Sequence, residues 1–216
     1  MLDEVAVRDA TPIGEVATCV PKQPAMAALV GSVIADGGIA LVHSDLGYLL
    51  CADALDRTAV RRAIGLRQQG RQRPFGIVGD PDIADRHVVI GRRARRLIRE
   101  TWPGTLALQL PRRRCLPSWA CAGPTATLLC PDAFFWRVAW AFGSPIAVAL
   151  AAGRGCPDAR RPCAGLAAAV DLVVDGGTSV AVAPTVIDLT TARPRVAHDG
   201  GLFAPQRLRR LVPELA

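Results

Sequence analysis

Short, wholly apolar runs that alternate with helical segments constrain the fold of this chain most. Ile39–Val42 and Ile146–Leu150 are apolar at every position, as in strands that are buried on both faces of a sheet. Other strand-like runs lie at 75–78, 105–110, 126–129, 172–175 and 185–189. Helical spacing of apolar residues occurs at 23–35, 55–64, 92–100, 134–142, 164–169 and 205–211. This alternation predicts an α/β layered domain with a parallel or mixed sheet.

Length and hydropathy favour a single domain. The chain has 216 residues, 50% of them hydrophobic, which suits one well-packed domain rather than two large ones. We expect residues 1–22 to form an extended arm, with a short strand as the alternative, and residues 23–212 to form the domain. No apolar run approaches the roughly 20 residues of a membrane span. The N-terminal sequence MLDEVAVRDATP lacks the build of a signal peptide, so we expect a cytoplasmic protein without a membrane partner.

The charge of the chain is strongly positive and almost entirely due to arginine. Lys and Arg number 26 against 19 Asp and Glu, for a net charge of +7, and Lys22 is the only lysine. Guanidinium groups bind phosphate at two points, so the excess favours an anionic partner, a nucleotide or RNA. An equally favoured alternative is that the arginines form a solvated surface and bind no anionic partner. Arg67, Arg71 and Arg73 on a glycine-containing loop predict a phosphate cradle.

The cysteines indicate free thiols rather than a metal site. There are seven of them, without a C-x-x-C pair. The spacing of Cys115 from Cys121, and of Cys156 from Cys163, is too wide for a zinc knuckle. Only three histidines could complete a zinc site. We therefore expect reduced thiols and no structural metal.

Residues 37–54 point to a ligand site. Polar His43, Ser44 and Asp45 end the apolar run, and ligands of open α/β sheets bind beyond the carboxyl ends of strands. Tyr48, the only tyrosine, comes next, and then a helical segment from Asp53 to Ile64. The alternative is that the three polar residues simply form a turn and cap the next element.

Two further segments bear on the core and on the site. The helical pattern at 134–142 places Phe134, Phe135 and Trp140 in the predicted core. After the strand at 146–150 come small residues, Ala151-Ala152-Gly153, where a ligand can approach the backbone closely.

The order of these motifs resembles the YrdC-type family of threonylcarbamoyl-adenylate synthases from Gln23 to Gly201. The family pattern PTDTVYGLGCDA corresponds to residues 43–54, and WPGPLT to residues 102–107. RVPDH corresponds to residues 129–133, and the late GG and STVVDL elements to residues 176–177 and 184–189. The Asp45-Leu46-Gly47-Tyr48 segment resembles the YciO-type branch more than the main synthase.

The resemblance implies a fold, an activity and partners. The fold would be a single-domain twisted mixed sheet with flanking helices around a basic concavity. The activity would join threonine, bicarbonate and ATP with Mg²⁺, release pyrophosphate and yield threonylcarbamoyl-AMP for tRNA modification. Some members bind double-stranded RNA or tRNA. Nucleotide, and double-stranded RNA or tRNA, are therefore the expected partners.

The resemblance also implies roles for individual residues. Arg67, Ser44 and Asp45 would form the catalytic set. The substrate pocket would include His43, Tyr48, Leu150 and His198. The nucleotide and its phosphates would be bound by the three arginines of the loop together with three later residues: Arg67, Arg71, Arg73, Ala151, Ala152 and Thr185.

Several positions depart from the family pattern, and each departure removes a charge or a donor. The lysine of K-x-R is Gly65, and S-A-N is Leu150-Ala151-Ala152. The arginine before VPD is Leu129, and the arginine near the C-terminal glycine is His198. A lost charge-assisted hydrogen bond costs about 1.5–3 kcal/mol, so nucleotide and threonine would be bound more weakly than in the main synthase.

Three hypotheses arise from these residues. The first is an enzyme that forms or hydrolyses an adenylate, on a carbamoyl substrate that can differ from threonylcarbamate. The second is a non-catalytic module that binds RNA, which requires a shared face for the arginines at 57, 61, 67, 71, 73 and 112–114. The third is a module that binds a protein partner through an exposed apolar patch.

Overall fold

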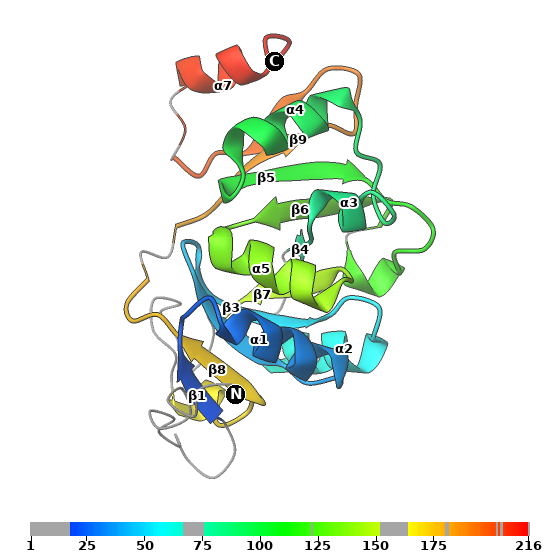
Figure 1. Cartoon of the computed structure of the whole chain (residues 1–216). Coiled ribbons are helices and arrows are strands. Elements are labelled where there is room, and N and C mark those ends of the chain that lie inside the picture. The colour runs from blue at the N-terminus through cyan, green and yellow to red at the C-terminus, as the bar shows by residue number, and fades with distance from the viewer. Residues whose placement is uncertain are drawn as a thin grey trace.

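One mixed β-sheet runs through the molecule and carries helices on both faces (Figure 1). The computed structural model describes residues 18–66, 76–121, 123–151, 164–179, 182–201, 203 and 205–215. Within these residues, ten strands lie in the order β1 (Thr18–Pro21), β8 (Leu172–Asp175), β2 (Ala40–Ser44), β3 (Gly47–Asp53), β7 (Ile146–Leu150), β4 (Gly76–Val78), β6 (Thr125–Cys130), β5 (Gly104–Pro111), β9 (Thr185–Asp188) and β10 (Arg195–His198).

The sheet mixes parallel and antiparallel pairs. β8 lies parallel to both β1 and β2, whereas β3 is antiparallel to its neighbours β2 and β7. In the other half, β4 and β6 are parallel, as are β5 and β9. Parallel pairs require long crossover connections, and here the two strands of each parallel pair are separated in sequence by helices and other strands. The predicted fold class, a mixed α/β domain with flanking helices, is confirmed.

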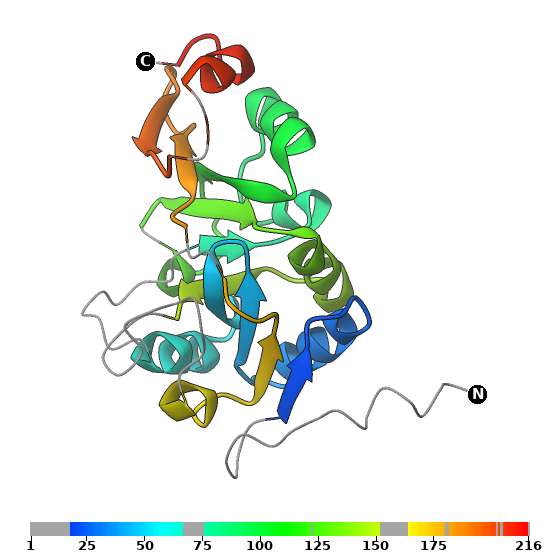
Figure 2. The same cartoon turned by 90° about the vertical axis from the view of Figure 1, so that its left-hand side faces the viewer.

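Helices cover the two faces unequally (Figure 2). One face carries α1 (Met26–Ala35), α3 (Pro81–Ala84), α4 (Arg92–Thr101) and α5 (Ala133–Phe142). The other carries α2 (Arg57–Leu66) and α6 (Ala164–Ala167). The last helix, α7 (Pro205–Leu211), lies beside α4. Within the described residues, no helix combines the length and the apolar character needed to cross a membrane.

The central strands bury both faces, so two hydrophobic clusters share them. In β2, Ala40 and Val42 belong to the cluster under α1 and α5. Ile39 and Leu41, which alternate with them, belong to the cluster under α2 and α6. Side chains that alternate along a strand point to opposite faces, so an all-apolar strand fills both cores.

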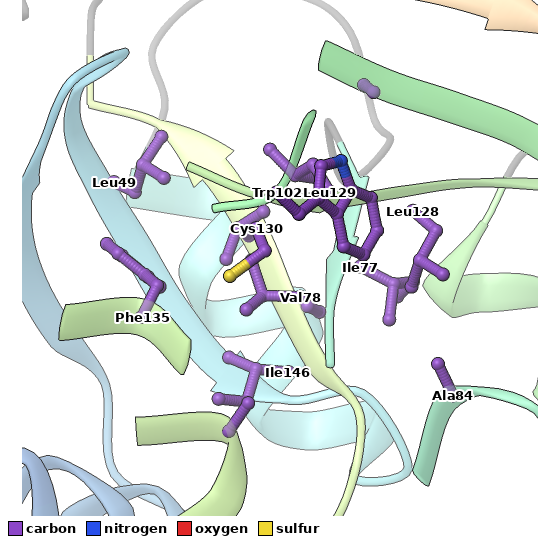
Figure 3. Packing of buried hydrophobic residues seen from close by; sticks show 14 of the residues in the cluster. Leu49, Ile77, Val78, Ala84, Trp102, Leu128, Leu129, Cys130, Phe135 and Ile146 are labelled. Atoms are coloured by element: carbon purple, nitrogen blue, oxygen red, sulfur yellow. The ribbon is translucent and has the colours of Figure 1, made fainter. Parts of the chain in front are cut away.

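The larger cluster is packed by side chains from many elements. Figure 3 shows Phe135 of α5 among Leu49, Cys130 and Ile146, which come from β3, β6 and β7. Phe135 is fully buried, as predicted. Asp132 begins α5, because its carboxylate accepts the backbone N–H of Phe135 at 3.0 Å.

The sequence analysis missed the short helix α3 and the strand β10, and it was wrong in two further places that bear on the site and the core. It assigned no strand between the polar residues at 43–45 and the helix, whereas β3 runs over Gly47–Asp53 and α2 begins only at Arg57. Nearly every β3 residue is buried, so the strand shows no alternation of polar and apolar residues. Trp140, predicted to be core, is 75% exposed, because α5 is apolar around most of its circumference and only one side faces the sheet.

Other expectations fit the structure. For residues 1–22 we expected an extended arm or a short strand. The described part of this segment contains a short strand, β1, which pairs with β8. The cysteines among the described residues, Cys19, Cys51, Cys115, Cys121 and Cys130, are free thiols. Burial raises the pKa of the Cys51 and Cys130 thiols, which keeps them protonated and chemically inert.

Candidate functional site

A cavity of about 540 Å³ opens beside the turn between β2 and β3. Its volume lies within the roughly 300–1,000 Å³ that is typical of small-molecule sites. Four stretches that are distant in sequence line it: His43, Ser44 and Asp45; Thr101, Pro103, Gly104 and Thr105; Thr178, Ser179 and Val182; Phe203 and Arg207. The predicted ligand site at 43–45 therefore lies on the wall of a cavity.

The hairpin turn fixes the position of Asp45. β2 and β3 pair directly from Ser44 and Gly47, which leaves a two-residue turn, and Gly47 has a φ of 111° that favours glycine. The hydroxyl of Ser44 donates to the carbonyl of Gly47 at 2.5 Å and accepts the backbone N–H of Leu46 at 3.2 Å. Ser44 is fully buried, while Asp45 is exposed beside it.

The loop after β8 is attached to this turn. Ser179 donates its hydroxyl proton to the carbonyl of Ser44 at 2.7 Å. Tyr48 has its hydroxyl within hydrogen-bond distance of the Asp175 carboxylate and, at 2.8 Å, of the Gly177 carbonyl. Burial, and then the bond to Asp175, raise the pKa of Tyr48. The phenol therefore stays protonated, and it holds the β8 end against β3.

His43 is held in a cluster that the sequence analysis did not identify. Lys22, just after β1, donates to the Asp132 carboxylate at 2.7 Å and lies 3.5 Å from His43 Nδ1. A Cβ added to Gly176 would lie 2.5 Å from Cγ of His43, so only glycine allows the backbone to pack against the ring. The available signals were weak: Lys22 is the only lysine, and Asp132 belongs to the motif at 129–133.

Other predicted site residues lie in separate places. Leu150 is half-buried at the end of β7, and the backbone N–H of Ala151 donates to the Tyr48 carbonyl at 2.8 Å. Thr185 is fully buried and accepts the backbone N–H of Gly200 at 3.1 Å. His198 is exposed in β10. Arg67, Arg71, Arg73 and Ala152 lie outside the described residues.

Several of the described arginines that the RNA hypothesis names make contacts with other residues of the chain. The Arg57 guanidinium lies over the Trp119 ring at 5.6 Å. Arg112 donates to the carbonyls of Gly123 and Leu116, and Arg113 donates to the carbonyls of Asp85 and Val88. These contacts shape the loop after β5, which reduces the number of side chains in this set that are available to a ligand.

A different group of arginines gathers where α4 and α7 meet. Arg96 of α4 donates to the carbonyl of Arg210 in α7 at 3.4 Å, so the two helices share one surface. We call it the α4–α7 arginine face, and its exposed members are Arg92, Arg93, Arg95, Arg96, Arg99, Arg207, Arg209 and Arg210. Arg207 also lines the cavity, with its guanidinium 5.2 Å from the Phe203 ring.

No group of three or more His, Cys, Asp or Glu suited to a metal ion occurs among the described residues. Mg²⁺ commonly binds through one or two carboxylates together with substrate phosphates and water. A Mg²⁺ ion carried by a bound nucleotide would therefore need fewer protein ligands than such a group provides.

Comparisons of the sequence place it among related proteins. The Sua5/YciO/YrdC family, described as "Telomere recombination", matches residues 32–200. A Mycobacterium leprae protein with the provisional name threonylcarbamoyl-AMP synthase is 31% identical over 188 residues, which are 82% of this chain and 81% of that protein. A threonylcarbamoyl-AMP synthase of Pyrococcus abyssi is 27% identical, and the match covers 81% of this chain and 54% of that protein.

Solved structures show the same fold. Pyrococcus abyssi Sua5, complexed with L-threonine, superposes with a TM-score of 0.75 and 23% identity, over 93% of this chain and 62% of that one. Escherichia coli YciO superposes with a TM-score of 0.68 and 22% identity, over 84% of this chain and 93% of that one. The chain thus spans under two thirds of the Sua5 structure and nearly all of YciO.

Proposed function

Because the chain belongs to the Sua5/YciO/YrdC family, we propose that it binds an ATP-type nucleotide and a small amino-acid substrate at the cavity beside the β2–β3 turn, and forms a carbamoyl-adenylate. The observation that supports this most directly is the cavity itself, which is of ligand size and is walled by polar side chains from four parts of the chain. A relative of the same fold was crystallised with L-threonine.

The proposed reaction is that of the threonylcarbamoyl-AMP synthases that the chain resembles. The substrate amine and bicarbonate would form a carbamate with loss of water; the carbamate oxygen would attack the α-phosphorus of ATP, and pyrophosphate would leave. In this scheme Asp45 orients the substrate, and Arg207, which also lines the cavity, binds its anionic groups. Arg67, Arg71 and Arg73 remain the predicted phosphate ligands.

Pyrophosphate release tests the proposal. We expect release to require ATP, Mg²⁺, bicarbonate and an amino acid together, with threonine as the first of a panel of amino acids. Asp45→Asn should lower kcat/KM about 10- to 100-fold, because a lost charge-assisted hydrogen bond costs about 1.5–3 kcal/mol.

Asp36→Asn is the matched control. Asp36 is an exposed carboxylate at the C-terminal end of α1 and does not line the cavity, so its loss should leave the rate unchanged. Titration calorimetry with ATP and Mg²⁺, with and without threonine, measures binding independently of turnover. Absence of both heat and pyrophosphate would contradict the proposal.

RNA binding is a second candidate, favoured by the α4–α7 arginine face. Some of its guanidiniums are paired, as Arg93 is with Glu214, Arg95 with Asp85, and Arg96 with Glu100. Arg92, Arg99 and Arg209 make no ion pair with a described carboxylate. Unpaired guanidiniums spaced along two adjoining helices suit a phosphate backbone.

Fluorescence anisotropy with duplex RNA or tRNA over a salt series tests this candidate. Arg92→Ala/Arg99→Ala/Arg209→Ala should weaken binding and reduce the salt slope by about one for each phosphate that is no longer neutralised. The control removes exposed arginines that belong to neither arginine set, with Arg86→Ala/Arg137→Ala, and should change affinity less for each charge removed. Equal effects per charge removed would reject a specific face.

A further inference from the structure

The only lysine of the chain, Lys22, lies in a partly buried cluster with Asp132 and His43, and His43 lines the cavity. Lys22 Nζ donates to Asp132 Oδ2 at 2.7 Å, and the two side chains are 16% and 12% exposed. The ammonium also lies 5.6 Å from the centre of the Phe134 ring. At this depth an ion pair is screened less than on the surface, so Lys22 has a defined position.

Asp132 is itself anchored, which fixes the lysine further. One carboxylate oxygen accepts a hydrogen bond from the backbone N–H of Phe135 at the start of α5. The other accepts a hydrogen bond from Lys22 Nζ. Lys22 therefore joins the end of β1 to the beginning of α5. Its third contact is Nδ1 of His43, at 3.5 Å.

The imidazole ring of His43 has little freedom to turn. The backbone of Gly176 packs against it so closely that no Cβ would fit. The ring of Tyr48 meets it edge-on, with centroids 5.3 Å apart and an interplanar angle of 85°. A ring held on several sides keeps one edge toward Lys22 and leaves Nε2 as its remaining polar atom.

The contact with lysine sets the charge and the tautomer of this ring. An ammonium group can only donate, so Nδ1 of His43 must accept, and the proton of the neutral ring then resides on Nε2. Burial first, and the Lys22 charge second, lower the pKa of His43, while Asp132, Asp45 and Asp175 oppose the shift. Nε2 has no hydrogen-bond partner among the described residues, and His43 lines the cavity.

We propose that the Lys22–Asp132 pair is a positioning device that holds His43 as a neutral imidazole, and that its Nε2–H donates to an anionic oxygen of the ligand in the cavity. The ligand is that of the proposed function, so the donor role rests on it; the oxygen belongs to an amino-acid carboxylate or to a nucleotide phosphate.

Histidine NMR tests the device without any ligand. The chain has three histidines, and His43→Gln assigns the His43 signal. In the wild type we expect the Nε2–H tautomer and a His43 pKa below the ordinary value. Lys22→Met should raise that pKa, because it removes a neighbouring cation and leaves Asp132 unpaired nearby.

Two further variants make the NMR result specific. Lys22→Arg should restore the low pKa, since it restores the charge. Arg137→Met, which removes an exposed cation from the same helix that Asp132 begins, should not change it. An Nδ1–H tautomer in the wild type, or a His43 pKa that Lys22→Met leaves unchanged, would overturn the proposed device.

Calorimetry then tests the donor, with ATP–Mg²⁺ and threonine titrated separately to identify which oxygen is bound. His43→Phe should weaken binding of one of them about tenfold or more. His43→Gln, whose amide nitrogen can replace Nε2, should recover part of the loss. If the wild type binds a ligand and His43→Phe binds it equally well, the donor role is wrong. If the wild type binds neither, the proposed function fails along with the donor role, and the NMR result alone decides the positioning device.

Discussion

At the scale of single residues, Tyr48 joins two distant parts of the chain. Its hydroxyl meets the Asp175 carboxylate and the Gly177 carbonyl, and accepts the backbone N–H of Gly176 at 3.3 Å. The phenol ring is fully buried among residues of the smaller core cluster. One side chain therefore connects β3 with the end of β8 and with Gly176 directly after it, which packs on His43.

We predict that Tyr48→Phe lowers the free energy of unfolding by about 1–3 kcal/mol, because buried polar groups lose a partner. Urea unfolding should show a lower midpoint with an unchanged slope. Thr191→Val is the control: it removes an exposed side-chain bond to the Arg193 carbonyl and should change stability by less than about 0.5 kcal/mol. Equal effects of the two variants would show that the Tyr48 hydroxyl has no special role.

Ser44 shows how much of a single residue's role could be predicted from its local sequence. Its position after an apolar run predicted either a ligand contact or a turn. The structure shows the hydroxyl engaged within the turn, and the same turn on the wall of a cavity. The two interpretations were compatible, because the turn is what presents Asp45 to the cavity.

At the scale of elements, α5 shows where hydropathy is insufficient. Its sequence AFFWRVAWAF has apolar residues on every side. The buried ones are Phe134, Phe135, Val138 and Ala139, which share the face toward the sheet. Composition predicted the helix, but only packing against α1 and the strands decided which aromatic residues are core.

We predict opposite outcomes for two aromatic residues of this helix. Phe135→Ala should lower the free energy of unfolding by about 3–5 kcal/mol, because it leaves a cavity in a close-packed core. Trp140→Ala, at a side chain that is 75% exposed, should cost about 0.5 kcal/mol or less. Denaturant unfolding of both variants measures the difference, and comparable losses would contradict the observed orientation of α5.

Most strands and helices could be predicted to within a few residues, whereas β3, like the short elements α3 and β10, could not. Strands β7 and β8 begin and end where their apolar runs do. β3 lies between two other strands and is buried on both faces, so its residues Gly47–Asp53 carry no alternating pattern. The hairpin signal was also weak, because its turn is Asp45-Leu46 rather than a glycine-rich pair.

At the scale of the whole molecule, strand order and the cavity were beyond local patterns. Apolar runs identify strands but do not tell which strands are neighbours, and the order here places β8 between β1 and β2. The cavity combines the β2–β3 turn with Thr101, Thr178 and Arg207. Arg207 is one of several arginines in the last helix, so nothing in its local sequence distinguished it.

Strand order also has a consequence for the biosynthesis of the protein. Val20 and Val42 both pair with Val174, which is synthesised long after either of them. While the chain emerges from the ribosome, the two early strands remain apart, each with an unsatisfied backbone edge. Such non-local pairing slows folding and prolongs the exposure of aggregation-prone segments, so nascent chains that stop short of β8 should depend on chaperones.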